Sequence, residues 1–100
     1  MATTTKALAR VAAGTSSTTL YTVPAATTTV ITNIAIVNTA GTAATATISL
    51  DGVVLVPAVS VAANNTTFID LKQVLAATKV VAGFASATTV NFHISGVEIA

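Results

Sequence analysis

Short runs in which apolar and polar residues alternate occupy much of this chain. The clearest is residues 45–50, where alanine, isoleucine and leucine take the even positions and threonine or serine takes the odd ones. Alternation with a period of two places the two sets of side chains on opposite faces of a β-strand. We therefore predict a strand here, with the even-numbered residues facing a core.

Turn-forming residues separate this strand from several others. Asp51-Gly52 is typical of a type I′ hairpin turn, Pro24 stops a strand because it has no N–H to donate, and Asn64-Asn65 tolerates positive φ. Residues 72–77 fit either a loop or a short 3₁₀ turn. The predicted strands are residues 18–23, 28–38, 45–50, 53–56, 66–71, 79–86 and 90–99, with 6–13 as either a further edge strand or an arm.

The same alternation predicts which residues form the core. In the long strand 28–38 it places Val30 on one face with Ile34 and Ile36, and leaves apolar residues on the opposite face as well. In the last strand the apolar residues change parity after Gly96, which predicts a β-bulge at that glycine. The expected core includes Leu20, Val30, Ile34, Ile36, Ile48, Leu50, Phe84, Phe92 and Ile94.

Seven to eight short strands separated by turns predict an all-β fold of one domain. Strands at this spacing are typical of an antiparallel β-sandwich with Ig-like or jelly-roll topology. We expect residues 1–13 to form an N-terminal arm or edge strand and residues 14–100 to form the sandwich domain.

Charge is unusually scarce in this sequence. Only 7% of the residues are charged, the net charge is +1, and the forty residues from Val11 to Leu50 contain no Lys, Arg, Asp or Glu. Scattered charge normally keeps a soluble chain monomeric, so this one is expected in a membrane, in an assembly or under a coat of hydroxyl groups. Thr, Asn and Ser interrupt every apolar run before the ~20 residues of a spanning helix, which disfavours the membrane. With no Cys and no secretory signal pattern, we expect synthesis in a cytoplasm.

The residues capable of chemistry do not form a recognisable catalytic or metal-binding pattern. His93, the only histidine, lies on the polar face of the last strand, and the nearest carboxylate, Glu98, has the opposite parity. No G-x-S-x-G nucleophile motif accompanies it. Asp51 is explained by its turn, and Asp70 by a local ion pair with Lys72 or a turn hydrogen bond. We expect no enzyme activity, no cofactor, no metal, and no nucleic-acid or small-molecule partner.

The threonine-rich outward faces of the strands are the most specific remaining feature. Threonine presents a methyl group as well as a hydroxyl, and burying a hydroxyl costs far less than burying an ion. Such a face packs against another protein at low desolvation cost, and it also serves as a neutral solvated surface. We favour packing because the uncharged stretch is so long.

Three segments resemble the small structural proteins in the virions of tailed bacteriophages. They are Thr19-Leu20-Tyr21-Thr22-Val23-Pro24-Ala25, Ile34-Ala35-Ile36-Val37-Asn38-Thr39 and Val90-Asn91-Phe92-His93-Ile94-Ser95-Gly96-Val97-Glu98-Ile99. The resemblance covers nearly the whole chain from about Thr18, and its motifs are turn and core patterns. Ala26 stands where the P-A-G-T turn of that group has glycine.

The resemblance implies a non-enzymatic β-sandwich component of the phage particle. We expect a capsid decoration (cement) protein, made in the host cytoplasm, that binds the outer head surface as a homotrimer and stabilises the major capsid protein lattice. The alternative is a tail-fibre or tail-associated module that binds a host surface or carbohydrate. We expect Lys6, Leu8, Arg10 and Val11 to contact the shell or a neighbouring subunit, and removal of residues 2–13 to leave the sandwich folded.

Overall fold

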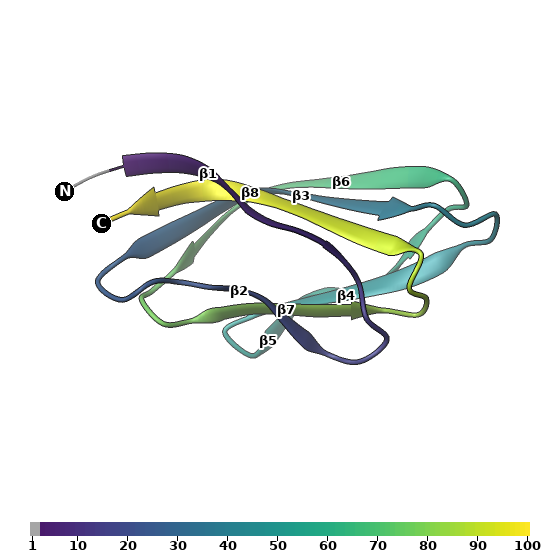
Figure 1. The fold of residues 1–100 in the computed structure, drawn as a ribbon, viewed down its shortest axis with the longest axis horizontal. Helices are drawn as coiled ribbons and strands as arrows, with labels where there is room; N and C mark the ends of the chain where they lie inside the picture. The colour runs from purple at the N-terminus through teal and green to yellow at the C-terminus, as the bar shows by residue number, and fades with distance from the viewer. Residues whose placement is uncertain (1–2) are drawn as a thin grey trace.

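The computed structural model describes residues 3–100, which form eight β-strands and no helix (Figure 1). The strands are β1 (Thr3–Ala12), β2 (Thr18–Thr22), β3 (Thr28–Asn38), β4 (Ala44–Leu50), β5 (Val53–Val61), β6 (Asn65–Leu75), β7 (Val80–Ala85) and β8 (Val90–Ile99). They pair in two antiparallel sheets that pack face to face, so the predicted all-β sandwich is confirmed.

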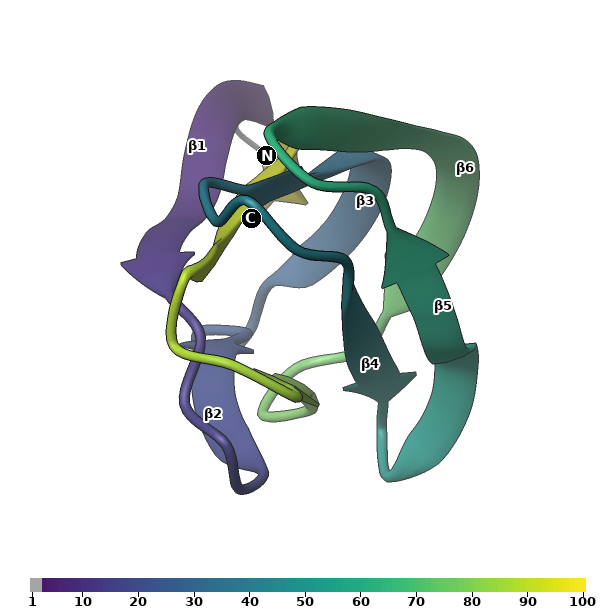
Figure 2. The ribbon, with the colours of Figure 1, turned by 90° about the vertical axis from the view of Figure 1, so that its right-hand side faces the viewer.

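The order of the strands is that of a jelly roll. The first strand pairs with the last, β2 with β7, β3 with β6, and β4 with β5, as if one long hairpin had been rolled up. Sheet A has the order β1-β8-β3-β6, and sheet B has the order β2-β7-β4-β5. Seen from one end, β1 lies over β2 on one side of the sandwich and β6 lies over β5 on the other (Figure 2).

The predicted turns are present, but two strands run further than predicted. Positive φ at Asp51 (52°) and Gly52 (76°) matches a type I′ turn, and Asn64 has a φ of 51°. β5 continues through Pro57 to Val61. The strand bulges at Pro57, so no hydrogen bond to the neighbouring strand requires the N–H that proline lacks. β6 likewise extends to Leu75, so neither the loop nor the 3₁₀ turn considered for residues 72–77 is correct over most of that range.

The core fills the space between the two sheets, and most of its predicted members are there. Six predicted residues are buried: Ile34, Ile36, Ile48, Leu50, Phe92 and Ile94. Leu20 is half-buried against them. Val30 and Phe84 were expected inside, but both are half-buried on outer faces, where Phe84 pairs with Thr47.

An extra residue in β3 explains the wrong placement of Val30. The register of β3 with β8 shifts between Ile31 and Asn33, so Thr32 has no partner of its own. The side-chain parity therefore changes within the strand, and Ile31 joins Ile34 on the inner face while Val30 turns outward.

The bulge predicted at Gly96 lies instead in the two strands beside it. β8 keeps its parity throughout, whereas β1 has an extra residue at Leu8 and β3 has one at Thr32. A Cβ atom on Gly96 would lie 2.3 Å from the carbonyl oxygen of Val30 and 2.9 Å from Leu8 Cδ1. The glycine is needed because the neighbouring strands approach β8 closely at this point.

Every edge strand contains a bulge, at which it has one residue more than the strand it pairs with. The register shifts place these residues at Leu8 in β1, Leu20 in β2, Leu55 in β5 and Leu71–Lys72 in β6. β5 has a second shift at Pro57-Ala58, where Ala58 has a φ of 42° and its N–H donates to the Thr47 hydroxyl. Leu8 belongs to the core, and the other three leucines pack against it. Each edge of the sandwich is thus bent around an inward-pointing leucine.

Candidate interaction surface

The charged side chains are divided unequally between the two sheets. The four strands of sheet B contain no Lys, Arg, Asp, Glu or His. The Lys, Arg, Asp, Glu and His residues in strands all belong to sheet A: Lys6, Arg10, Asp70, Lys72, His93 and Glu98. Asp51 and Lys79 lie in loops and form an ion pair at 3.7 Å. The sandwich therefore has one charged sheet and one neutral sheet.

The outer surface of sheet B is covered by hydroxyl, methyl and apolar side chains. The prediction for β4 is confirmed, since its even-numbered residues are buried and its threonines and serine face outward. We call this surface the neutral face; its residues are Thr19, Thr22, Thr45, Thr47, Ser49, Val54, Ser60, Val80, Ala82 and Phe84. Because it holds no ion, it can be covered by another protein without the cost of burying a charge.

The outer surface of sheet A mixes charge with apolar groups. Strand pairing aligns Arg10, His93, Ala35 and Phe68 in one row across the four strands. In the adjacent row the Asn33 amide donates to the Asp70 carboxylate at 3.0 Å. Within residues 3–100 Asp70 has no ion pair with Lys72, so the local pairing expected from their spacing is wrong; the partner comes from β3 instead.

Among residues 3–100, four of the five large apolar side chains that are exposed lie on one side of the sandwich. They are Val53 (70% exposed) and Val54 (56%) on β5, and Phe68 (70%) and Val74 (68%) on β6. The fifth, Val11 (42%), is on β1 at the opposite side (Figure 2). We call the first group, with the two strands that carry it, the β5/β6 side.

The four residues expected to contact a partner all lie in β1, which is an integral edge strand. Nine of its residues pair with β8. Leu8 points into the core and is only 8% exposed, so it cannot contact a partner as expected. Lys6, Arg10 and Val11 are exposed. Residues 1 and 2 lie outside the described part of the chain, and removal of residues 2–13 would take away a strand and a core leucine, contrary to the expectation of a dispensable arm.

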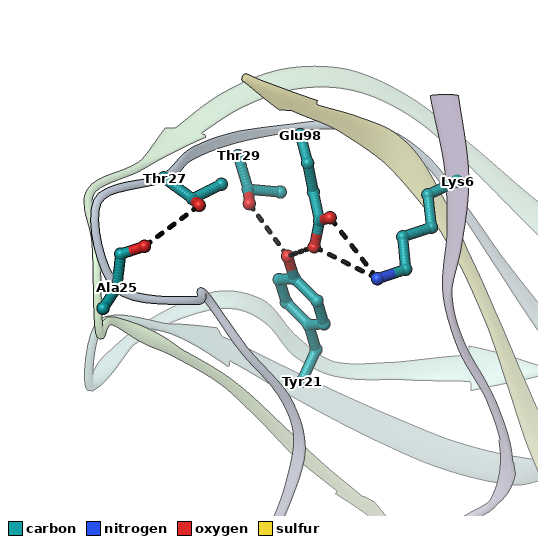
Figure 3. Close-up of polar contacts among 6 residues, drawn as sticks. All are labelled: Lys6, Tyr21, Ala25, Thr27, Thr29 and Glu98. Atoms are coloured by element: carbon teal, nitrogen blue, oxygen red, sulfur yellow. Dashed lines mark hydrogen bonds and ion pairs between the residues drawn. The ribbon is translucent and has the colours of Figure 1, made fainter. Parts of the chain in front are cut away.

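A hydrogen-bonded group joins the two sheets at the end where β8 finishes (Figure 3). The Tyr21 hydroxyl of sheet B reaches sheet A, where it donates to the Glu98 carboxylate and lies 2.9 Å from the Thr29 hydroxyl. The Lys6 ammonium lies 3.3 Å from the same carboxylate. Sequence reasoning missed this group because Lys6 and Glu98 are 92 residues apart and meet only through the first-to-last strand pairing.

These contacts shift the protonation equilibria of two residues in opposite directions. Burial raises the pKa of the Tyr21 hydroxyl, and the hydrogen bond to Glu98 raises it further. The hydrogen bond from Tyr21 lowers the pKa of the Glu98 carboxyl despite its partial desolvation, and Lys6 lowers it as well. The group is most stable with the phenol protonated and the carboxylate charged, which suits a structural clamp between sheets.

Asn38 holds the opposite end of β3 and the loops around it. Its side chain is 1% exposed, and the amide nitrogen donates to carbonyl oxygens of Thr42, Val61 and Ala62 at 2.8, 3.2 and 3.4 Å. The amide oxygen accepts from the Ala40 N–H at 3.1 Å and from the Thr89 hydroxyl at 3.3 Å. Every hydrogen-bonding capacity of the amide is used, so the residue is a structural tie between three loops.

The residues that carry chemistry stay apart in the folded chain. Residues 3–100 contain no group of three or more His, Cys, Asp or Glu placed to hold a metal ion. His93 lies exposed between Arg10 and Ala35 in its row. The described strands are accompanied by no helix of the length and apolarity needed to cross a membrane. Comparisons of the chain with protein-family models, with curated proteins and with solved structures each return no match.

Proposed function

We propose that the protein is a bacteriophage head decoration protein. It binds the outer surface of the capsid as a homotrimer and stabilises the lattice of the major capsid protein. The observation that carries this proposal is the neutral face of sheet B, four strands wide and free of charged side chains. The motif resemblance to phage virion proteins and the jelly-roll order, which recurs in viral capsid domains, support it as analogies.

The neutral face has the properties required for docking on another protein. Its hydroxyl and methyl groups can be desolvated without leaving a buried ion, and its rows run across all four strands of the sheet. Thr19, Ala82, Ser49 and Val54 form one such row from β2 to β5. Weak contacts of this kind suffice on a shell, because many copies bind at repeated sites and each multimer engages several of them.

Sheet A, which carries the charged side chains, suits exposure to solvent rather than docking. In the proposed orientation sheet A, with Arg10, Asp70 and His93 on its outer surface, faces solvent. The Tyr21–Glu98 contact at one end and the Asn38 amide at the other tie the loops and sheets together. A module that stabilises a lattice has to transmit force without deforming, and a sandwich fastened at both ends meets that need.

Co-sedimentation with capsids tests the proposal. The probe is heads purified from the phage or prophage that encodes the chain. Thr19→Lys places a charge on the neutral face, and Thr5→Lys is the matched control, an exposed threonine on an edge strand of sheet A. We expect wild type and T5K to sediment with heads at stoichiometric amounts and T19K to bind at least ~10-fold more weakly.

Two results would overturn the proposal: wild-type protein that stays in the supernatant, or T5K and T19K that weaken binding equally. Mass-spectrometric copy number adds an independent readout. Hundreds of copies per particle fit a head protein, whereas a handful would favour the tail-fibre module that binds a host surface or carbohydrate.

A further inference from the structure

We propose that the protein binds a neutral sugar unit of a surface glycan in a hollow at one end of sheet A. The residues that line it are Val37, Asn38, Thr39, Asn64, Asn65 and Thr66. We call it the Asn64 hollow. The inference goes beyond the proposed function, in which sheet A faces solvent, so a copy attached to a capsid through sheet B keeps this hollow open.

The hollow lies where the end of β3 meets the start of β6, at the end of the sandwich that faces the viewer in Figure 2. Val37 and Thr66 are cross-strand partners and contribute its part within the sheet. The Asn64 N–H donates to the Ala40 carbonyl oxygen at 2.9 Å, which ties the turn before β6 to the loop after β3. The backbone around the hollow is therefore held in place before a ligand arrives, which lowers the entropic cost of binding.

The polar groups of the hollow have unused hydrogen-bonding capacity. The Asn65 amide oxygen accepts from the Thr66 N–H at 2.8 Å, while its NH₂ group remains available. Among residues 3–100, no group forms a hydrogen bond with the Asn64 amide or the Thr66 hydroxyl. An amide offers donors and an acceptor side by side, and a hydroxyl offers both on one atom. These groups match the hydroxyls of a sugar, which also donate and accept.

The hollow favours a neutral ligand over a charged one. Among the described residues, those that line it include no ionisable side chain. Further along the same face of β6, the Asp70 carboxylate is occupied by the Asn33 amide at 3.0 Å. An ionic ligand would lose hydration without gaining a counter-charge, whereas the hydroxyls of a neutral sugar exchange water for amide partners.

Phe68 provides an apolar surface beside the hollow. It follows Thr66 by two residues on the same outer face of β6, at a distance of roughly 7 Å. It is 70% exposed, and its cross-strand neighbour Ala35 is too small to cover the ring. One face of a pyranose ring presents C–H groups that pack on an aromatic ring, while the hydroxyls at its rim reach polar partners. An exposed ring beside available amides therefore matches both sides of a sugar.

The size of the hollow limits the ligand to about one sugar unit. Its volume is about 270 Å³, close to the lower end of the ~300–1,000 Å³ of ligand pockets. We expect a single sugar in such an open site to bind with a Kd of about 1 mM. A glycan with repeated units would bind a particle that carries many copies far more tightly through multivalency.

NMR titration of the isotope-labelled free protein with glucose, galactose and mannose tests the inference. We expect at least one of these sugars to shift the amide signals of residues 37–39 and 64–68, with a Kd of about 1 mM. Glucuronate, galacturonate and mannuronate are the acidic counterparts of the three sugars. We expect each to bind more weakly than the matching neutral sugar, because its carboxylate finds no counter-charge in the hollow.

Three variants remove the proposed contacts one at a time. Phe68→Ala removes the apolar surface, Thr66→Val removes the hydroxyl at similar size, and Asn64→Gly removes the amide but suits the positive φ of 51° at that turn. Val74→Ala is the matched control for F68A, since Val74 is an exposed apolar residue on the same face of β6, away from the hollow. We expect F68A, T66V and N64G to bind at least ~5-fold more weakly and V74A to bind as wild type does. Circular dichroism melts establish that each variant is folded.

Absence of shifts with all three neutral sugars would overturn the inference, as would shifts confined to other parts of the chain or tighter binding of the acidic sugars. F68A, T66V and N64G that bind as wild type does would also refute it, and so would V74A that weakens binding as much as F68A. The T19K co-sedimentation test reports on sheet B alone. Binding to heads without sugar binding therefore refutes only this inference, and sugar binding without binding to heads refutes only the proposed function.

Discussion

Replacing Asn38 with alanine removes the buried amide that ties three loops at one end of the sandwich. Three carbonyl oxygens lose a donor, and the Ala40 N–H and the Thr89 hydroxyl lose an acceptor. The site is almost closed to water, since Asn38 is 1% exposed. The change therefore leaves polar groups without partners in a place where solvent replaces them poorly.

The expected loss can be worked from these contacts. A buried polar group left without a partner costs ~1–3 kcal/mol. The contact with the Val61 carbonyl is fully buried, while those with Thr42 and Ala62 are partly open, so water offsets some of their loss. We expect a decrease of about 3–4 kcal/mol in the free energy of unfolding, a large share of the ~5–15 kcal/mol typical of a domain.

Urea denaturation followed by circular dichroism at neutral pH measures this decrease. For a domain of this size, Tm should fall by roughly 12–30 °C in a parallel thermal scan. Asn33→Ala is the matched control, because Asn33 lies on the same strand and makes one exposed hydrogen bond, to Asp70. We expect N33A to lose less than ~1 kcal/mol. Asn38→Asp leaves no cavity, but it removes the donors and places a carboxylate beside the loop carbonyls at neutral pH, so it should destabilise at least as much as N38A.

A loss of less than ~1 kcal/mol in N38A, or one no larger than in N33A, would refute this prediction, because a buried amide with five contacts would then contribute no more than an exposed one. A stable N38D variant at neutral pH would likewise show that donation to the loop carbonyls is unimportant.

Other local features lead to further predictions. Gly96→Ala should cost about 2–4 kcal/mol, because its Cβ would lie 2.3 Å from a carbonyl oxygen of β3. Gly41→Ala, with nothing within 4 Å of its Cβ, should change stability by less than ~0.5 kcal/mol. Equal melting temperatures for the two variants would contradict this prediction. Ala26→Gly should stabilise by about 0.5–1 kcal/mol, because Ala26 has a φ of 57°, and an unchanged or lower urea midpoint would speak against strain there. The pKa of Glu98 in the folded state is lowered from its ordinary value of 4.5, so this carboxylate stabilises the fold when the pH is above 4.5. The stabilisation is lost as the pH falls through the folded-state pKa. Tyr21→Phe should flatten this acid dependence, measured as urea midpoints between about pH 2 and 7, and an unchanged dependence would exclude the phenol as its cause. The raised pKa of Tyr21 predicts a loss of stability at alkaline pH. The stabilisation by the protonated phenol is complete below its ordinary pKa of 10.0 and is lost as the pH rises through the folded-state pKa.

Alternation and turn chemistry were enough to predict the strands and most of the core. β3 and β8 have the predicted bounds, and the type I′ turn lies where Asp51-Gly52 indicated. Both signals are local, so they can be read from neighbouring residues. The choice between Ig-like and jelly-roll topology was not readable in this way, because it depends on pairing β1 with β8, at opposite ends of the chain.

Bulges account for the main errors in the predicted core and strand ends. Assigning faces by a period of two assumes that every residue of a strand has a partner on the next strand. Thr32 has no such partner, and nothing in the residue types around it marks the bulge. Leucine carries a usable signal, since it is sparse in this β-rich chain and occurs at a register shift in all four edge strands.

The candidate surface was predictable only in part. The uncharged stretch from Val11 to Leu50 contains β2 and β4 of the neutral face, but also β3, which belongs to the other sheet. β5 and β7 complete the face from separate parts of the sequence. The β5/β6 side had no local signal, because Phe68 and Val74 look like core residues until the sheet order places them at an edge.

The leucine bulges provide a protection against fibre formation that does not depend on charge. Most proteins protect open strand edges with charged side chains, and salt weakens that protection because the Debye length falls from ~10 Å at 0.1 M to ~3 Å at 1 M. Here a kink at each edge prevents a foreign strand from lying flat, and ionic strength does not alter a kink. We expect the protein to resist fibrillation equally in low and high salt, and a variant with Leu55 deleted, which removes one of the two bulges in β5, to lose part of that resistance.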